Sequence, residues 1–329
     1  MQQQSFYESN IPIAISHLRN DGQIPTILQY FDGGQCRVFK LLESEAQILR
    51  ELELKGFLWA ARLRGCSLTF DNAIKYPFIA LTWIPGSQLS WSDNFPTQPH
   101  RNRILDQVAK MHTSLIECSK QARTLNAFRS NWALLTSPGG SSLKHFTRII
   151  QNKTRRVREG LLPEITAKDC SEQMKILPDI LLSELDEAPF AIAHGDLSPQ
   201  NILIDAYHNV TGIIDWGFSA RVPFQQAACF PRFLQLQNID MSPSSTLLKD
   251  RETYITSIRR QNNLVASLMM IQVLSSENVD FQHCFLESII SKGMHRRLAR
   301  NGWRLSPYGR AGDGEDDSRK KNGTLFFSF

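Results

Sequence analysis

The chain of 329 residues is 42% apolar and 21% charged, a composition typical of a globular protein with one large domain or two smaller ones. Its net charge of +5 is mild over this length, and no array of basic and aromatic residues accompanies it. The charge therefore gives little support to a nucleic-acid-binding protein. Six widely spaced cysteines without a CxxC pair argue against a zinc site and against a disulfide framework.

The sequence patterns do not predict a membrane protein or an exported one. The longest apolar runs are far shorter than the roughly 18 residues that indicate a membrane-spanning helix. The first ten residues, MQQQSFYESN, lack a basic region followed by an apolar stretch, so we expect no signal peptide. These features predict a reduced, cytoplasmic protein with no membrane partner.

The first 85 residues predict a small, mainly β unit with one helix. Apolar runs on either side of Gly33-Gly34 are typical of a hairpin, and Pro85-Gly86 ends the last strand pattern. The helix is indicated by apolar residues along one side of a segment that stops at a glycine. The elements expected here are a hairpin within 22–42, a helix at 43–56, and strands at 68–70 and 78–84.

From residue 100 onward the helical period dominates. Apolar residues recur every three or four positions, as at Ile104, Val108 and Met111, which predicts an amphipathic helix. We expect helices at 101–122, 144–159, 171–186, 225–237, 246–274 and 279–300. The polar, glycine-rich end of the chain predicts disorder. The chain would then divide into a small lobe at 1–85, a larger helical lobe at 86–305 and a tail at 306–329.

The stretch HGDLSPQNILIDAYHNVTGIIDWGF, at 194–218, carries the candidate chemistry. Two short apolar runs around a turn predict a hairpin, with Asp205 capping the turn. Asp196 and Asn201 come just before the first strand and Asp215 ends the second, so we expect all three side chains to converge. Such oxygen ligands suit Mg²⁺, which proteins hold with one or two carboxylates plus substrate phosphates. Asn201 and Asp215 fit this pair, which leaves Asp196 to accept a proton from a substrate hydroxyl.

The spacing from Asp to Asn is that of the kinase signature H-R-D-L-x-x-x-N, which D-F-G follows. Here the two parts read HGDLSPQN at 194–201 and DWG at 215–217. Together, HGDLSPQNILID and GIIDWGFSARVPF resemble the aminoglycoside phosphotransferase family, within the kinase-like group that includes choline and fructosamine kinases. VPFQQAACFPRFL, at 222–234, is similar to fungal members, and the resemblance spans about 20–300.

This resemblance implies an α+β, protein-kinase-like two-lobed fold, with a small β-rich N-terminal lobe and a larger, mainly helical C-terminal lobe. It also implies a small-molecule kinase that uses ATP and Mg²⁺ to phosphorylate a hydroxyl group. By the same resemblance Asp196 would be the catalytic base, and Asn201 and Asp215 would hold Mg²⁺ against the ATP phosphates. His194 would be a buried residue that braces the loop.

The segment FIALTWIPGSQL resembles the strand and hinge that bind adenine in this family. The backbone of Thr82, Trp83 and Ile84 would therefore meet the adenine edge. The candidate phosphate-covering loop, FDGGQC, has two glycines but no G-x-G-x-x-G pattern.

Kinase-like folds also place a lysine on the third strand, paired with a glutamate on the next helix. Glu45 is the candidate glutamate and Lys40 the candidate lysine, with Arg37 as a further possibility. Lys40 and Glu45 are only five positions apart, which is barely enough for the end of a strand, a connection and the start of a helix. Either the connection is compressed, or Lys40 lies on an earlier strand and the lysine strand is missing.

Two functions therefore stay open at this point. The first is an ATP- and Mg²⁺-dependent phosphotransferase with a small-molecule acceptor whose identity the sequence does not indicate. The second is a catalytically impaired, kinase-like binding or scaffold protein with an incomplete ATP lobe. A protein kinase is less favoured, because no A-P-E element follows DWG at the kinase spacing.

Overall fold

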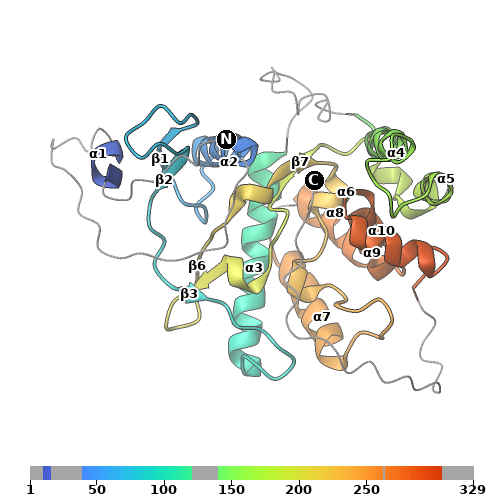
Figure 1. Cartoon of the computed structure of the whole chain (residues 1–329). Coiled ribbons are helices and arrows are strands. Elements are labelled where there is room, and N and C mark those ends of the chain that lie inside the picture. Colours follow the sequence, from blue (N-terminus) through green and yellow to red (C-terminus); the bar gives the residue numbers. More distant parts are fainter. Residues whose placement is uncertain (1–9, 16–38, 121–139, 262–263, 306–329) are drawn as a thin grey trace, which may run out of the picture. The chain divides into compact units, whose positions relative to one another are not determined.

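The computed structural model describes residues 10–15, 39–120, 140–261 and 264–305 (Figure 1). They belong to two compact units, the first drawn from 1–119 and 192–220 and the second from 120–191 and 221–329. The lobe boundaries expected at residues 85 and 305 divide the chain differently, and they stay a prediction. None of the helices in the described ranges combines the length and the hydropathy that crossing a bilayer requires.

The first unit mixes helices with short strands. Its elements are α1 (Ile11–Ile15), α2 (Phe39–Leu54), β1 (Leu63–Ser67), β2 (Phe78–Leu81), β3 (Ser87–Gln88), α3 (Gln98–Ser119), β5 (Ile202–Ile204) and β6 (Val210–Ile213). Strands β4 (Ala191–Ala193) and β7 (Ala220–Val222) form a separate two-stranded sheet.

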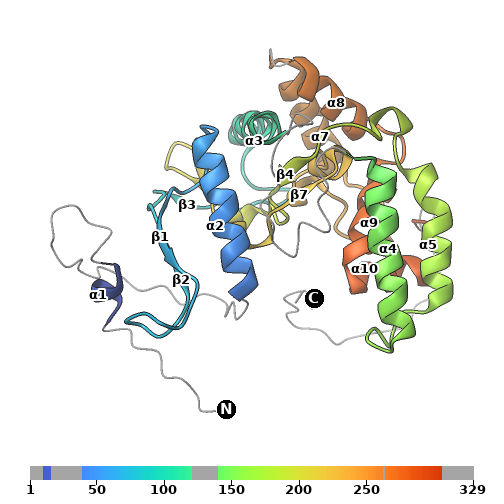
Figure 2. The ribbon, with the colours of Figure 1, turned by 90° about the horizontal axis from the view of Figure 1, so that it is seen from above.

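Helix α2 forms because its apolar residues fall on one face. Ala46, Leu49 and Leu52 are at most 1% exposed, and Gly56 ends the helical run with a φ of +74°. The helix lies beside β1 and β2 (Figure 2). It begins at Phe39, so residues 39–42 are helical where the sequence suggested the end of a strand. The rest of the expected hairpin lies outside the described residues.

The strands make short antiparallel pairs. β1 pairs with β2, and β3, β5 and β6 form a three-stranded sheet in that order. Ile202 pairs with Ile213, which confirms the hairpin expected from the sequence. Gly86 precedes β3 with a φ of +135°, and a Cβ there would come within 2.7 Å of the carbonyl oxygen of Ile204. Only glycine therefore allows β3 to approach β5 this closely.

Helix α3 supports the hairpin from one side. Its face of Ile104, Val108 and Met111 is fully buried, as the periodicity predicted. Gln107 projects from this helix and accepts the backbone N–H of Val210 at 2.9 Å, while its amide nitrogen donates to the carbonyl oxygen of His208 at 3.1 Å. The side chain thereby pairs backbone groups at the turn, which fixes the hairpin on α3.

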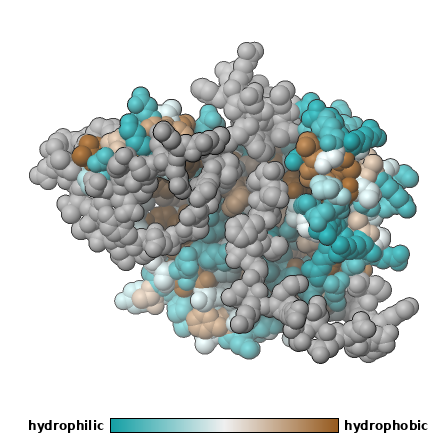
Figure 3. All heavy atoms as spheres, viewed as in Figure 1, coloured by the Kyte–Doolittle hydropathy of each residue, from teal (hydrophilic) through white to brown (hydrophobic). Residues whose placement is uncertain are grey.

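The second unit is helical apart from its strand residues. Its helices are α4 (Ser142–Arg158), α5 (Ala167–Ile180), α6 (Phe224–Ala227), α7 (Ser245–Arg259), α8 (Leu264–Leu274), α9 (Val279–Ile290) and α10 (Lys292–Arg300). α4, α5, α9 and α10 lie side by side around an apolar core that includes Phe146, Leu177 and Phe285 (Figure 2). Hydrophilic residues cover α4 and α5 on the outside (Figure 3).

A buried lysine joins these four helices. The ammonium group of Lys153, on α4, donates to Gln173 Oε1 and to the carbonyl oxygen of Ser288, each at 2.8 Å. It also lies 3.0 Å from Nδ1 of His295. Burial lowers the pKa of Lys153 to about 7.

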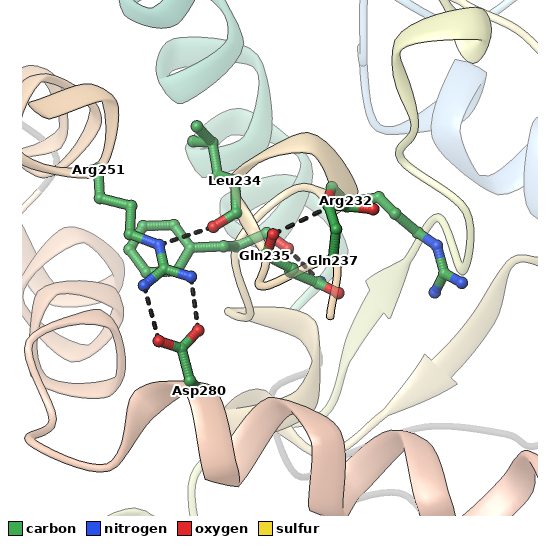
Figure 4. Close-up of polar contacts among 7 residues, drawn as sticks. Arg232, Leu234, Gln235, Gln237, Arg251 and Asp280 are labelled. Atoms are coloured by element: carbon green, nitrogen blue, oxygen red, sulfur yellow. Dashed lines mark hydrogen bonds and ion pairs between the residues drawn. The ribbon is translucent and has the colours of Figure 1, made fainter. Parts of the chain in front are cut away.

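The helix expected at 225–237 is wrong beyond Ala227. Pro223 caps α6, which ends at Ala227, and Pro231 caps a single 3₁₀ turn at Arg232–Leu234. Instead, the side-chain amides of Gln235 and Gln237 donate to backbone carbonyls at Phe230 and Arg232, at 2.6 Å and 2.8 Å (Figure 4).

Arg251 of α7 holds the same segment. Its Nε donates to the carbonyl oxygen of Leu234 at 2.7 Å, and its two terminal nitrogens donate to the carboxylate of Asp280 (Figure 4). Its guanidinium also lies over the ring of Phe230. Local side-chain bonds and a distant arginine therefore replace the helix that the apolar spacing suggested.

Other predicted element boundaries also differ from those in the structure. The strand expected at 68–70 is wrong, because β1 ends at Ser67 and the Asn72 amide bonds the chain into a turn. The helix expected to reach residue 186 ends at Ile180. The helix expected at 279–300 is two helices, since Ser291 caps α10 by accepting the N–H of Met294. The segment 246–274 is likewise two helices.

Candidate active site

The loop between β4 and β5 begins with His194 and Gly195. Gly195 has a φ of +84°, and a Cβ at this position would overlap the backbone carbonyl of Phe218. The kinase signature has arginine here, and the close approach of the 215–218 segment explains why this chain needs glycine. Gly195 thereby lets Asp196 stand directly beside the second half of the motif.

Asp196 and Asn201 are in direct contact. The amide nitrogen of Asn201 donates to the backbone carbonyl oxygen of Asp196 at 2.9 Å and to its Oδ2 at 3.1 Å. The 3₁₀ turn Pro199–Asn201 brings them together, and Asn201 is only 6% exposed. Because its nitrogen is used in both bonds, the amide oxygen of Asn201 is kept for another partner.

A backbone hydrogen bond brings the segment of Asp215 next to this pair. The N–H of Ile214 donates to the carbonyl oxygen of Asn201 at 3.0 Å, so the residue before Asp215 is bonded directly to Asn201. Asp215 itself adopts a left-handed conformation with a φ of 61° at the end of the hairpin. The structure thus brings the backbone of Asp196, Asn201 and Asp215 to one end of the hairpin, and the convergence of all three side chains stays a prediction.

His194 braces the two halves of the motif. It is 3% exposed, and its Nε2 donates to the carbonyl oxygen of Ile214 at 3.0 Å. The N–H of Asp196 donates weakly to its Nδ1, at 3.4 Å. Burial lowers the pKa of His194, so the ring is neutral and both nitrogens are used in holding backbone. The sequence expectation of a buried histidine is confirmed.

Trp216 anchors the second half. Its ring is 1% exposed, and its centroid lies 4.7 Å from that of His194 and 5.9 Å from that of Phe57. The indole nitrogen donates to the carbonyl oxygen of Ile213 at 3.2 Å. The sequence indicated Trp216 only as part of a motif. Its packing against Phe57 was not predicted, because Phe57 lies in a loop far away in the chain.

Glu45 reaches the same segment from α2. It accepts a hydrogen bond from the backbone N–H of Trp216, and its Oε2 lies 3.8 Å from where a Cβ on Gly217 would stand. Burial first, and the charge of Asp215 second, raise the pKa of Glu45 to about 7. Glu45 therefore lies against the 215–217 segment, and its role as the partner of a phosphate-binding lysine stays a prediction.

Lys40 is placed differently from the expectation. Lys40 is the second residue of α2, so it lies on the same helix as Glu45. The expectation was a lysine on a strand and a glutamate on the helix that follows that strand. Five residues along a helix correspond to about 1.4 turns. The strand-borne lysine is therefore not Lys40, and Arg37 lies outside the described residues.

The predicted hinge follows β2. Thr82 is held by two bonds to Arg62: its N–H donates to the Arg62 carbonyl oxygen at 2.9 Å, and its Oγ1 accepts the Arg62 N–H at 2.8 Å. The side chain of Trp83 is 74% exposed. The side chain of Ile84 lies against Gly212 of β6. The hinge is thus tied to β1 on one side and to the hairpin on the other.

Comparison with known proteins agrees with this architecture. The model of the phosphotransferase enzyme family (APH) matches residues 17–224, more than half of the chain. A comparison with curated protein sequences gave no match. Among solved structures, the streptomycin–ATP complex of APH(2'')-IIa has a TM-score of 0.50 at 13% identity, covering 81% of each chain. The gentamicin complex of the same enzyme has a TM-score of 0.49 at 14% identity, covering 81% of this chain and 79% of that one.

The fold is therefore the α+β, kinase-like fold of the aminoglycoside phosphotransferases. The chain belongs to the phosphotransferase enzyme family, and it is a phosphotransferase of the small-molecule kinase class. This confirms the resemblance read from HGDLSPQN and DWG. The roles of the individual site residues stay predictions.

Proposed function

We propose that the chain transfers the γ-phosphoryl group of ATP to a hydroxyl group of a small molecule, in a Mg²⁺-dependent reaction. The observation that carries this proposal is the meeting of Asp196, Asn201 and Asp215 at one end of the hairpin. Two hydrogen bonds from Asn201 to Asp196 and one from Ile214 to Asn201 hold them there.

Asp196 is the proposed catalytic base. One of its carboxylate oxygens accepts the amide of Asn201, which orients the group and leaves the other oxygen for the acceptor hydroxyl. The buried His194 is bonded to the backbone of both Asp196 and Ile214, and Gly195 allows the close approach of Phe218. In phosphoryl transfer such positioning, together with charge neutralisation, supplies most of the catalysis.

Asn201 and Asp215 are the proposed ligands of Mg²⁺. An amide oxygen and a carboxylate form the hard donor set that Mg²⁺ prefers, and phosphate oxygens would complete it. Within the described ranges, no three His, Cys, Asp or Glu side chains are grouped to hold a metal ion. When bound, the ion would neutralise charge on the β- and γ-phosphates.

Adenine is proposed to meet the backbone at 82–84. The N–H of Thr82 is already bonded to Arg62, so its carbonyl oxygen and the N–H of Ile84 are the groups we assign to the adenine edge. Glu45 is assigned to the phosphate side. A complex of APH(2'')-IIa with ATP and streptomycin supports a nucleoside triphosphate and a hydroxylated acceptor. We propose the cytoplasm as the site of this reaction, and the acceptor is to be found by experiment.

Thermal unfolding with and without Mg-ATP tests the proposal first. A ligand at 100 times its Kd adds about 2.7 kcal/mol to the free energy of unfolding, which gives a clear rise in Tm. ATP consumption with a panel of hydroxylated metabolites then identifies the acceptor. No change in Tm at millimolar Mg-ATP would favour the alternative, a kinase-like binding or scaffold protein.

A further inference from the structure

A cavity of about 290 Å³ opens at the C-terminal end of α2, within the first unit. Its walls come from the last turn of α2 and the loop that leads to β1. They include Glu53, Phe57, Leu58, Ala60, Ala61 and Arg62. Pockets for drug-sized ligands occupy about 300–1,000 Å³, so this cavity suits a smaller molecule.

The lining combines an apolar floor with two opposite charges. Phe57 and Ala61 are 5% and 6% exposed, and Leu58 adds an exposed apolar side chain. Glu53 and Arg62 carry a negative and a positive charge on the same cavity. Across the part of the chain that the structure describes, neither side chain takes part in a hydrogen bond or an ion pair with another residue.

We propose that this cavity binds a small zwitterion with an apolar side chain, the chemical class of the apolar α-amino acids. The ammonium group of the ligand pairs with the carboxylate of Glu53, and its carboxylate pairs with the guanidinium of Arg62. The apolar side chain lies against Phe57 and Ala61. A ligand with both charges pairs with both Glu53 and Arg62, whereas a ligand with only a carboxylate or only an ammonium group leaves one of these side chains without a partner.

The walls connect directly to the candidate active site. The ring of Phe57 meets the edge of Trp216, the residue that follows Asp215. Trp59, in the same loop, accepts the backbone N–H of Ile213 through its carbonyl oxygen at 2.7 Å. A ligand that shifts this loop therefore acts on the end of β6 that carries Asp215.

Arg62 provides a second connection, because its backbone exchanges two hydrogen bonds with Thr82 of the predicted hinge. We therefore expect occupancy of the cavity to change the affinity for Mg-ATP, and Mg-ATP to change the affinity for the zwitterion by the same factor. Only this coupling rests on the proposed function; binding of the zwitterion does not.

Isothermal titration of the full chain with L-leucine, without nucleotide, tests the binding. Three analogues form matched controls: 4-methylpentanoate lacks the ammonium group, 3-methylbutylamine lacks the carboxylate, and glycine lacks the apolar side chain. L-Leucine is expected to bind, and each analogue to bind about tenfold more weakly or worse, as loss of a charge-assisted contact requires.

Variants locate the site. Glu53→Gln and Arg62→Gln should each weaken L-leucine binding about tenfold, since each removes one charged partner at an exposed position where folding is little affected. Glu51→Gln and Arg64→Gln, close by but outside the lining, should leave it unchanged. No heat with L-leucine, equal binding of the analogues, or unchanged binding by both lining variants would overturn the proposal.

The coupling is measured as the Kd for Mg-ATP with and without saturating L-leucine. A reproducible change supports a regulatory site, and an unchanged Kd overturns the regulatory part. If Mg-ATP does not bind at all, the proposed function fails while the titration with L-leucine still decides whether the cavity binds a zwitterion.

Discussion

The amide nitrogen of Asn201 lies 2.9 Å from the backbone carbonyl oxygen of Asp196 and 3.1 Å from its carboxylate Oδ2. One side chain thus fixes both the backbone and the carboxylate of the proposed base. It can do so because the 3₁₀ turn Pro199–Asn201 brings Asn201 back toward Asp196 across the four residues between them. The first two predictions depend on this geometry.

Replacing Asp196 by asparagine should abolish turnover while Mg-ATP still binds. The variant keeps the shape of the side chain but cannot accept the proton of an acceptor hydroxyl, a function worth about 10²–10⁴ in rate. Turnover is measured by ATP consumption with an acceptor, and Mg-ATP affinity by titration. A rate close to that of the unmodified protein would exclude Asp196 as the base.

Replacing Asp215 by alanine should remove the effect of Mg²⁺ on ATP binding. The carboxylate is the only full negative charge in the proposed metal pair, so without it the ion gains little at this site. ATP affinity is measured with Mg²⁺ and with a chelator in its place.

Asp205→Ala is the matched control for this experiment. Asp205 lies in the same hairpin and accepts the N–H groups of Tyr207 and Asn209, each at 2.8 Å, as the expected turn cap. Its loss should lower Tm yet keep the Mg²⁺ dependence. If both variants lose the Mg²⁺ dependence equally, the effect belongs to the hairpin and not to a metal ligand.

Gly195→Ala should lower both stability and turnover. The added Cβ would overlap the carbonyl group of Phe218, and the φ of +84° is itself unfavourable for alanine. Since neither backbone can move without displacing Asp196 or Asp215, we expect a loss of more than about 2 kcal/mol in the free energy of unfolding. Chemical denaturation measures it.

Gly293→Ala, in helix α10, makes the same chemical change in an open position, where the nearest atom to the new Cβ is 3.9 Å away. Alanine is preferred in helices, so this variant should be neutral or more stable by up to about 1 kcal/mol. Equal destabilisation by the two changes would contradict the close approach at Gly195.

Lys153→Met should change how stability depends on pH. Burial lowers the pKa of Lys153 from 10.5 to about 7, so the unfolded chain binds a proton that the folded protein has released. The free energy of unfolding of the unmodified protein therefore rises between pH 7 and pH 10.5, and this stabilisation is lost as the pH falls toward 7. Methionine removes this contribution.

Methionine also removes the donor to Gln173 Oε1 and one donor to the Ser288 carbonyl oxygen, at a cost of about 1–3 kcal/mol. The gap between the two proteins should then be larger at pH 9 than at pH 7, by about 1–2 kcal/mol in urea denaturation. Lys168→Met, at an exposed position, is the control. Parallel pH profiles for Lys153→Met and the unmodified protein would contradict the prediction.

Local sequence patterns were enough to predict those helices and strands that depend mainly on residues close by in the chain. The hairpin of β5 and β6 is contained in two apolar runs and a turn, and α2, α3 and α4 follow from the spacing of their apolar residues. The segment 225–237 has a similar spacing but is largely non-helical. Its backbone is bound by its own glutamines and by Arg251, which lies elsewhere in the chain. Periodicity carries no information about such partners.

The sequence by itself determined the family and the residues of the motif. The spacing from Asp196 to Asn201 and the position of Asp215 after a short hairpin are local features, and local hydrogen bonding enforces them. Only the tertiary structure decided that Glu45 accepts the N–H of Trp216, that Lys40 lies on the same helix as Glu45, and that Phe57 packs on Trp216 beside a cavity. The contacts of Glu45 and Phe57 with Trp216 join segments about 160–170 residues apart in the sequence, and they exist because burying apolar surface brings α2 and its loop against the end of the hairpin.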